Sequence, residues 1–292
     1  MIIVKIQGGL GNQMFEYSAA KWLESIGKNV KLDVSHYDTQ FKGRSDVMHN
    51  GFELAGLFSL SVPYASLKEA ERLGDISRNP LHRIRRNLQG KKATHFTSDR
   101  FPGRRWYYPE LADIENGYLD GAWCSFKYAE KCEDVIRKEF VFKGKLEGKN
   151  YDVAEEMAIS ESVSIHIRHG DYLKLQDIYH ILEPEYYFSA IEYMKKHVEN
   201  PVFYCFSDDV EWCRSVFGEQ VKYIDWNTGK NSYIDMQLMS LCKHNILANS
   251  TFSMWGAWLN TNRNKIIVRP KRVFKKMEDE YEDMFPESWT VI

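Results

Sequence analysis

The chain has 292 residues, 43% of them hydrophobic and 27% charged, which suits one large globular domain or two of moderate size. Its formal net charge of −2 argues against nucleic acid as the main partner, and no window approaches the roughly 18 consecutive apolar residues of a membrane span. The five cysteines are odd in number and show no C-x-x-C spacing, so we expect buried free thiols in a cytoplasmic protein.

The first elements predict a strand–helix–strand unit. Residues 2–6 (IIVKI) read as a strand, and GGLGNQ follows as a tight turn that opens a helix ending at Gly27. A second strand is expected over 29–34, and two strands joined through a helix pair in parallel. The stretch 36–120 is irregular, and one further helix is expected over 128–140.

The polar segment 143–150 (KGKLEGKN) predicts a linker to a second α/β series. Its strands are expected over 162–167, 202–206, 221–224, 245–248 and 265–268, and its helices over 184–198, 209–217, 233–242 and 252–260. We therefore expect an α/β protein with two Rossmann-like domains facing across a cleft. They would span 1–145 and 150–270, and the tail 271–292 would pack back on the first domain.

The turn after the first strand is a candidate ligand-binding element. Gly9-Leu10-Gly11 partly matches a dinucleotide-binding fingerprint, but Met14 stands where that motif has glycine. A tight structural turn is the simpler interpretation. Asn12, at the start of the expected helix, would offer its amide to a sugar or a leaving oxygen.

The stretch SIHIRHGDY ends a strand on a second group of functional side chains. His166 and Arg168 are two apart, which places them on one face at the carboxyl end of the strand, where open α/β sheets bind ligands. Arg168 suits a phosphate, and Asp171 would either hold Arg168 or act on the substrate. Two other interpretations compete: a phosphatase built on Arg168-His169-Gly170, and an arginine simply paired with a neighbouring carboxylate.

Two later strands also end on polar residues. FYCFSDD places Asp208 and Asp209 at a strand end, which suits a nucleotide or a divalent metal. NILANST places Asn249, Ser250 and Thr251 at the start of a helix, where hydroxyl and backbone N–H groups can hold phosphate. Helix capping is the simpler role for some of these residues. Three strand ends with ligand-type side chains in one domain form a stronger pattern than any one of them.

Together, the ordered segments GGLGNQMFEY, GAWCSFKY, HIRHGDY, FYCFSDD and DMQLMSLCKHNILANSTFSMWGAWL resemble glycosyltransferase family 11, the α-1,2-fucosyltransferases, in their bacterial form. The resemblance covers essentially the whole chain and is loose only over 36–120. It implies a GT-B architecture with an acceptor-side N-terminal domain and a C-terminal domain that binds GDP-fucose. It also implies inverting transfer of L-fucose to O2 of a terminal galactose in an oligosaccharide or glycan, with neither metal nor cofactor.

The resemblance also assigns roles to individual residues. Arg168 corresponds to the arginine that binds the β-phosphate, and Asp208 to the aspartate that contacts guanine. Asn12 would lie near the reacting sugar. By resemblance, His166 would lie by the nucleotide, and Ser250 and Thr251 by the phosphates. With the residues proposed above from the sequence itself, the predicted catalytic residues are Arg168, Asn12 and Asp171, and the predicted donor-binding residues are His166, Arg168, Asp208, Asn249, Ser250 and Thr251. One departure is His169, where the family usually has a second arginine; strand alternation predicts that it faces away from the diphosphate.

Several alternatives stay open. A metal-dependent GT-A transferase would use Asp208 and Asp209 as ligands, and a non-catalytic sugar- or nucleotide-binding module would need no catalytic arginine. The phosphatase is disfavoured because its motif belongs on a first strand, whereas Arg168-His169-Gly170 lies mid-chain. Asp33 joins Asp171 as a candidate general base.

Two further segments carry hypotheses of their own. The indole of Trp123 is a candidate platform for galactose, with a core position as the alternative. The basic run 78–92 (RNPLHRIRRNLQGKK) is a candidate for peripheral contact with the inner face of a membrane, with a solvated helix or loop as the alternative.

Overall fold

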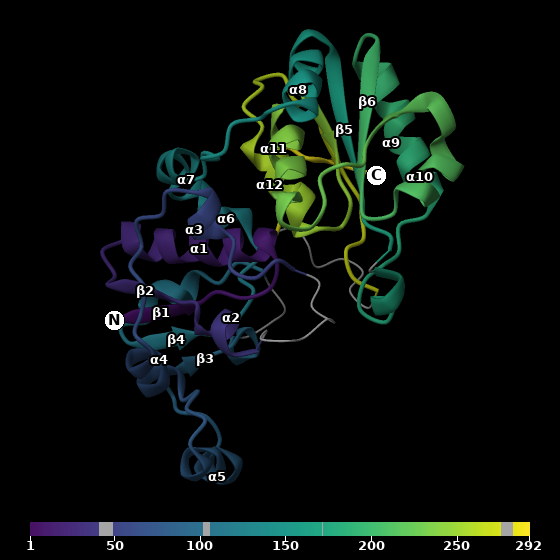
Figure 1. Ribbon diagram of the computed structural model, residues 1–292. Helices are drawn as coiled ribbons and strands as arrows, with labels where there is room; N and C mark the ends of the chain where they lie inside the picture. Colours follow the sequence, from purple (N-terminus) through teal and green to yellow (C-terminus); the bar gives the residue numbers. More distant parts are fainter. Residues whose placement is uncertain (41–48, 102–105, 171, 276–282) are drawn as a thin grey trace. The chain divides into compact units, whose positions relative to one another are not determined.

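The computed structural model describes residues 1–40, 49–101, 106–170, 172–275 and 283–292 (Figure 1). The chain divides into two compact units, each of which is described by itself. Unit 1 contains Met1–Lys143 with Glu280–Pro286, and unit 2 contains Gly144–Asp279 with Glu287–Ile292. Within the described residues, no helix is both long enough and apolar enough to cross a membrane.

Unit 1 is built on a parallel sheet of strand order β2-β1-β4-β3. Its strands are β1 (Ile2–Lys5), β2 (Val30–Asp33), β3 (His95–Phe96) and β4 (Gly117–Leu119). The long helix α1 (Leu10–Ser25) connects β1 to β2, which confirms the predicted strand–helix–strand opening. Strands β3 and β4 lie within the stretch that seemed irregular, because runs of two and three residues give no readable pattern.

Short helices make up most of the rest of unit 1. They are α2 (Ser35–Gln40), α3 (Leu54–Leu57), α4 (Leu67–Gly74), α5 (Pro80–Gln89), α6 (Phe126–Glu130) and α7 (Glu133–Glu139), with 3₁₀ turns η1 (Ser98–Arg100) and η2 (Pro109–Asp113). The single helix expected over 128–140 is wrong. The backbone leaves the helical region at Cys132 (φ −138°, ψ 38°), while the apolar spacing continues across the break and hides it.

Unit 2 is built on a parallel sheet of strand order β10-β9-β8-β5-β6-β7. Its strands are β5 (Glu161–Ile167), β6 (Pro201–Ser207), β7 (Lys222–Ile224), β8 (His244–Ile246), β9 (Ile267–Arg269) and β10 (Thr290–Val291). The chain starts at β5 in the middle, adds β6 and β7 on one side, and then returns to add β8, β9 and β10 on the other. This is the strand order of a Rossmann fold.

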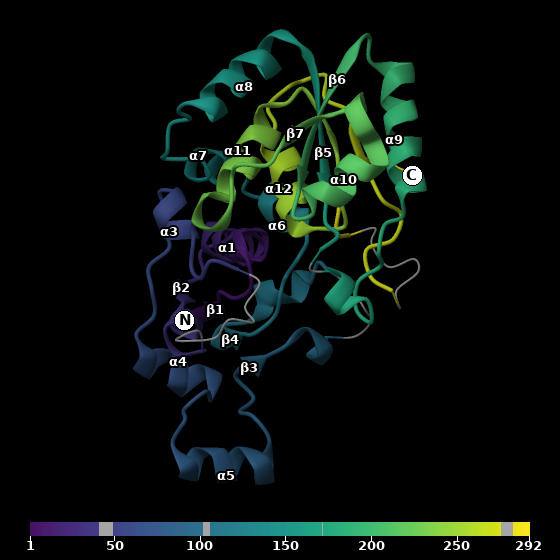
Figure 2. The same cartoon turned by 45° about the vertical axis from the view of Figure 1, so that its right-hand side comes forward.

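Helices accompany this sheet in the described part of unit 2 (Figure 2). They are α8 (Lys149–Ile159), α9 (Pro184–His197), α10 (Val210–Phe217), α11 (Tyr233–Leu241) and α12 (Thr251–Leu259), with 3₁₀ turns η3 (Tyr172–Leu175), η4 (Gly218–Gln220) and η5 (Gly229–Asn231). All except α8 were predicted within a few residues. Helix α8 was not predicted; only its first two residues, Lys149 and Asn150, fall within the expected linker.

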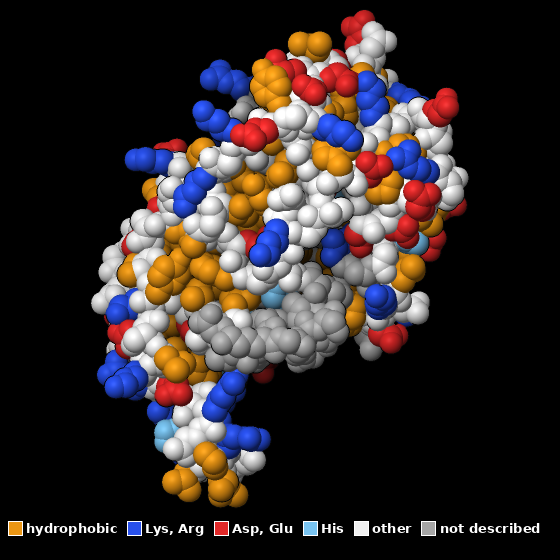
Figure 3. Space-filling view, viewed as in Figure 1, with side chains coloured by type: hydrophobic (Ala, Val, Ile, Leu, Met, Phe, Trp, Pro, Cys, Tyr) orange, Lys and Arg blue, Asp and Glu red, His pale blue; other side chains and the backbone are white. Residues whose placement is uncertain are grey.

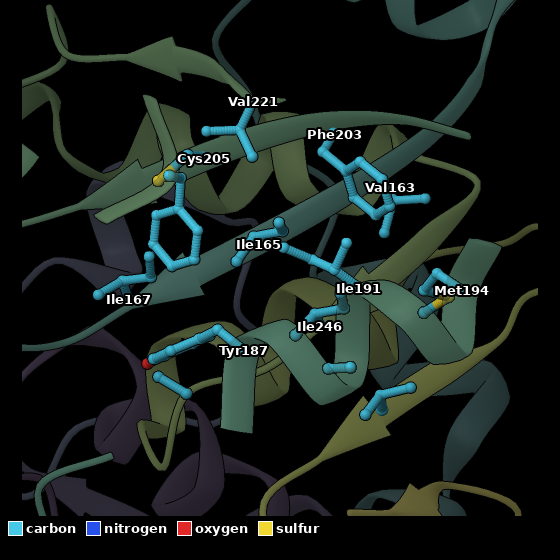
Figure 4. Close-up of a cluster of buried hydrophobic side chains, with 14 of the residues drawn as sticks. Val163, Ile165, Ile167, Tyr187, Ile191, Met194, Phe203, Cys205, Val221 and Ile246 are labelled. Atoms are coloured by element: carbon cyan, nitrogen blue, oxygen red, sulfur yellow. The ribbon is translucent and has the colours of Figure 1, made fainter. Parts of the chain in front are cut away.

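One hydrophobic cluster of unit 2 lies where helices α9 and α10 pack on the sheet. Val163, Ile165 and Ile167 alternate along β5 and pack with Tyr187 and Ile191 of α9 (Figure 4). These five side chains are at most 2% exposed. A strand anchored on its buried face in this way presents its carboxyl end in a fixed position. The five cysteines of the chain are free and buried, as predicted.

Candidate functional site

The predicted donor-binding residues meet at one edge of the unit 2 sheet. Strands β8, β5 and β6 are neighbours and run in parallel, so their carboxyl ends lie side by side. The chain that leaves β5 continues to β6 on one side of the pair, whereas the chain that leaves β8 continues to β9 on the other. The edge between β5 and β8 is therefore the switch point at which open α/β sheets bind their ligands.

Arg168 directly follows β5 at this edge. Its Nε lies 3.7 Å from Oδ2 of Asp208, and both side chains are partly exposed, at 28% and 22%. The second carboxylate oxygen of Asp208 accepts a hydrogen bond from the backbone N–H of His169 at 3.0 Å. Asp208 thus links the ends of β5 and β6 and orients the arginine, so the simple ion-pair interpretation describes part of the geometry.

The side chain of His169, unlike its backbone N–H, contacts helix α10 and its N-cap. Its Nδ1 lies 2.8 Å from Oδ2 of Asp209, and its ring stacks on Trp212 with centroids 4.3 Å apart. Strand β5 ends at Ile167, so the alternation used to predict the direction of His169 does not extend to that residue. The contacts with Asp209 and Trp212 set its direction.

His166 is a buried, uncharged imidazole close to the guanidinium of Arg168. Burial lowers its pKa to about 3, with a further contribution from the charge of Arg168. Its ring lies 5.7 Å from that of Phe252, and its Nδ1 has no hydrogen-bond partner among the described residues. A buried polar atom without a partner is uncommon and indicates a position where a ligand can supply one.

The residues after β8 are largely buried: Asn249 and Ser250 are 2% and 8% exposed, and Thr251 is half-buried. The side-chain amide of Asn249 donates to the carbonyls of His180 and Val273, at 2.7 and 2.8 Å, and so ties two loops together. Ser250 is the N-cap of α12 and accepts from the N–H of Phe252 at 3.4 Å. Thr251 begins α12, so the positive end of this helix dipole lies at the switch point.

The glycine turn of unit 1 holds Asn12. Gly8 has a φ of +73°, and a Cβ at this position would lie 2.7 Å from Nδ2 of Asn12. The positive φ favours glycine at this position, and a Cβ there would displace the amide of Asn12. The neighbouring Gln13 is fully buried and bonds to the backbone of Gly8, Gly51 and Glu53, so its role is structural.

Sequence reasoning missed a charged cluster at the carboxyl edge of the unit 1 sheet. Asp120 follows β4 and lies 2.7 Å from Nζ of Lys5 and 3.3 Å from Nε2 of His95. Burial opposes its ionisation, but the hydrogen bonds from His95 and Lys5 outweigh burial and hold its pKa below the ordinary range. The only signal was a lone aspartate after a three-residue strand, GYLDG.

Three further predicted residues differ in outcome. Asp33 is 3% exposed and accepts hydrogen bonds from the Tyr118 hydroxyl and the Ser35 N–H, so it is not a general base open to substrate. Trp123 is 2% exposed and packs edge-on against Tyr108, which makes the exposed-platform interpretation wrong. Asp171 lies outside the described residues.

The described residues contain no group of three or more His, Cys, Asp or Glu side chains that could hold a metal ion. They do contain a hollow of about 580 Å³ lined by Glu161, His197 and His244. It lies at the amino ends of β5 and β8, which is the wrong edge of the sheet for a nucleotide site. The carboxyl edge therefore remains the candidate site.

The two α/β units, each with a parallel sheet, have the architecture of the GT-B class. The solved structure of the fucosyltransferase NodZ from Bradyrhizobium matches this fold with a TM-score of 0.50, at 16% identity, over 87% of this chain and 90% of NodZ. Residues 75–292 match the family described as Glycosyl transferase family 11. The chain belongs to glycosyltransferase family 11.

Curated relatives agree with this membership. An alpha-1,2-colitosyltransferase from Escherichia coli is 31% identical over all of this chain and 99% of its own length. A galactoside alpha-(1,2)-fucosyltransferase 1 from Saimiri boliviensis boliviensis is 26% identical over 53% of this chain and 46% of its own length. The GT-B class rules out the GT-A alternative, and the family membership removes the support for a phosphatase.

Proposed function

We propose that the chain transfers L-fucose from GDP-fucose to O2 of a terminal galactose in an oligosaccharide or glycan. The transfer inverts the anomeric carbon and uses neither metal nor cofactor. The observation that carries this proposal is the place of Arg168. A guanidinium stands at the Rossmann switch point, beside the N-terminus of α12, where a nucleotide diphosphate would bind.

Charge stabilisation by the protein is the proposed source of catalysis. As the sugar–phosphate bond breaks, negative charge grows on the β-phosphate oxygen and positive charge on the sugar ring. The guanidinium of Arg168 and the α12 N-terminus, with Ser250 and Thr251, would stabilise the leaving diphosphate. Fixed donors of this kind can take the part that a metal plays in other transferases.

His166 and Asp208 would support Arg168. An uncharged His166 adds no competing cation beside the guanidinium, and its buried Nδ1 is available to the nucleotide. Asp208 holds Arg168 in place, and we keep a guanine contact as its proposed second role. Asn249 would act indirectly, by fixing the loops around the site.

Asn12 in unit 1 is proposed to orient the acceptor. An amide can orient a hydroxyl but cannot deprotonate it, so a carboxylate has to be the base, if there is one. Asp171 remains proposed for this role. Asp120 is not a second candidate, because its contacts with Lys5 and His95 hold its pKa low and so make its carboxylate a weak base.

GDP-colitose is a second candidate donor. The relative named alpha-1,2-colitosyltransferase is 31% identical over the whole chain, and colitose is fucose without its 3-hydroxyl group. A site that hydrogen-bonds this hydroxyl rejects the sugar that lacks it by a large factor, whereas a site that does not use it accepts both. GDP-fucose and GDP-colitose therefore separate the two donor preferences.

The test is a nucleoside-diphosphate release assay, reading GDP and UDP, on the full chain with GDP-fucose, GDP-colitose and UDP-galactose, each with and without galactoside acceptors. We expect acceptor-dependent release of GDP from GDP-fucose, unchanged in excess chelator. Faster release from GDP-colitose would replace the donor in the proposal. Nucleotide binding without release from any donor would favour a non-catalytic module.

A further inference from the structure

Helix α5 of unit 1 exposes an apolar stripe. It has no buried residue, yet Leu81, Ile84 and Leu88 are 73%, 56% and 80% exposed. Their spacing of three and four residues places them on one side of the helix. Figure 3 shows hydrophobic side chains gathered over this helix, with lysine and arginine side chains nearby.

The helix is well formed and its orientation is fixed. Asn79 caps its start by accepting from the N–H of Leu81, Pro80 occupies the first position, and Gly90 follows its end with a φ of 73°. Arg86 donates to the carbonyl of Ser77, which joins the helix to the body of unit 1.

The apolar stripe points away from the body of unit 1. At 100° per residue, Arg86 lies about 140–160° around the helix from each of the three apolar side chains. The contacts of Arg86 with Ser77 and of Arg85 and Arg86 with Asp75 hold the helix to the body, and the high exposure of Leu81, Ile84 and Leu88 shows that they point away from it. Figures 1 and 2 show α5 at the end of unit 1, joined to α4 and β3 by two connecting segments.

The surroundings of the stripe carry one sign of charge. No acidic residue occurs between Asp75 and Asp99, whereas this segment contains six lysines and arginines: Arg78, Arg83, Arg85, Arg86, Lys91 and Lys92. The whole chain has a net charge of −2, so this excess of positive charge is local. Asp75 offsets part of it through contacts with Arg85 and Arg86.

We propose that α5 docks on an anionic lipid surface, with Leu81, Ile84 and Leu88 inserted among the lipids and the flanking cations on the headgroups. An exposed aliphatic stripe beside a cationic surface is the pattern of helices that lie in a membrane interface. A second copy of this chain fits less well, because pairing two such stripes would bring like charges together. The proposal is independent of the transferred sugar.

The experiment is co-sedimentation of the full chain with vesicles of phosphatidylcholine alone and of phosphatidylcholine with phosphatidylglycerol. We expect binding to the anionic vesicles only, weakened by added salt. Serine at Leu81, Ile84 and Leu88 together should lower the affinity at least about tenfold. Arg83→Glu should also lower it about tenfold or more.

A matched control removes three exposed aliphatic side chains elsewhere. Val141, Ile159 and Leu241 are 62%, 88% and 49% exposed, and serine at all three should leave vesicle binding unchanged. Circular dichroism and the midpoint of thermal unfolding check that each variant folds. If the α5 triple variant does not fold, the effects of Arg83→Glu and of added salt on vesicle binding test the proposal.

Equal binding to both vesicle types, or anionic binding that survives the triple serine substitution, would overturn the proposal. So would self-association in sedimentation velocity that the α5 triple variant abolishes, without vesicle binding by the unmodified chain. That result would assign the stripe to a second copy.

Discussion

Replacing Arg168 with lysine isolates the geometry of the proposed diphosphate contact from its charge. Lysine can still pair with Asp208, which lies 3.7 Å from the guanidinium in the structure. It cannot offer two parallel donors to a phosphate, because its ammonium acts as a point charge. The variant therefore keeps the positive charge and loses the two parallel hydrogen-bond donors.

The expected loss follows from where the interaction acts. Removing one donor that stabilises developing negative charge costs about 10²–10³ in kcat, or about 2.7–4 kcal/mol of transition-state stabilisation. Lysine retains the charge, so we expect a decrease in kcat of about 10²-fold, with a smaller change in the KM for donor. Arg168 and Asp208 are partly exposed, so unfolding stability should change by less than about 1 kcal/mol.

The assay is initial-rate GDP release at saturating GDP-fucose and acceptor, with the thermal midpoint as a folding check. His169→Arg is the matched comparison. The His169 side chain contacts Asp209 and Trp212, so this variant should remain active. Equal loss of kcat in both variants would refute the assignment of roles within HIRHGDY.

Two other predictions concern the folded state. Trp123→Ala should lower the free energy of unfolding by about 3–5 kcal/mol, because the ring is 2% exposed and packs on Tyr108. Chemical denaturation measures this loss. A loss near zero would contradict the buried position of the indole. Burial raises the pKa of Asp235 from 3.8 to about 7, although a hydrogen bond from Asn227 opposes the shift. The unfolded chain then releases this proton near pH 4 and the folded chain near pH 7, so the contribution of Asp235 to stability falls over that interval and stays low above it. Asp235→Asn should remove this slope and raise stability at pH 8 by about 1–3 kcal/mol; parallel stability–pH curves for the two proteins would contradict the argument.

The sequence was most informative where a single pattern covered a whole element. The long alternating strand β5 and helices such as α9 and α12 could be predicted within a few residues, because their apolar spacing persists. The clustering of Arg168, Asp208 and Ser250 could also be predicted, since parallel strands end at a common edge.

Contacts between distant segments could not be predicted in this way. Trp123 looked like a surface platform because nothing near it in sequence shows that Tyr108 covers it. Asp33 was a candidate base because the sequence does not show that the hydroxyl of Tyr118, 85 residues away, donates to its carboxylate. Asp120 was missed because β4 is only three residues long.

The most direct test of the account is the structure of the product. The full chain is incubated with GDP-fucose and a galactose-terminated oligosaccharide, and the glycosidic linkage is determined by nuclear magnetic resonance. The account predicts an α-linked fucose on O2 of the terminal galactose, formed without added metal and lost in parallel with kcat in Arg168→Lys. A β-linked product, a linkage to another hydroxyl, or no transfer from GDP-fucose to any galactoside would contradict it.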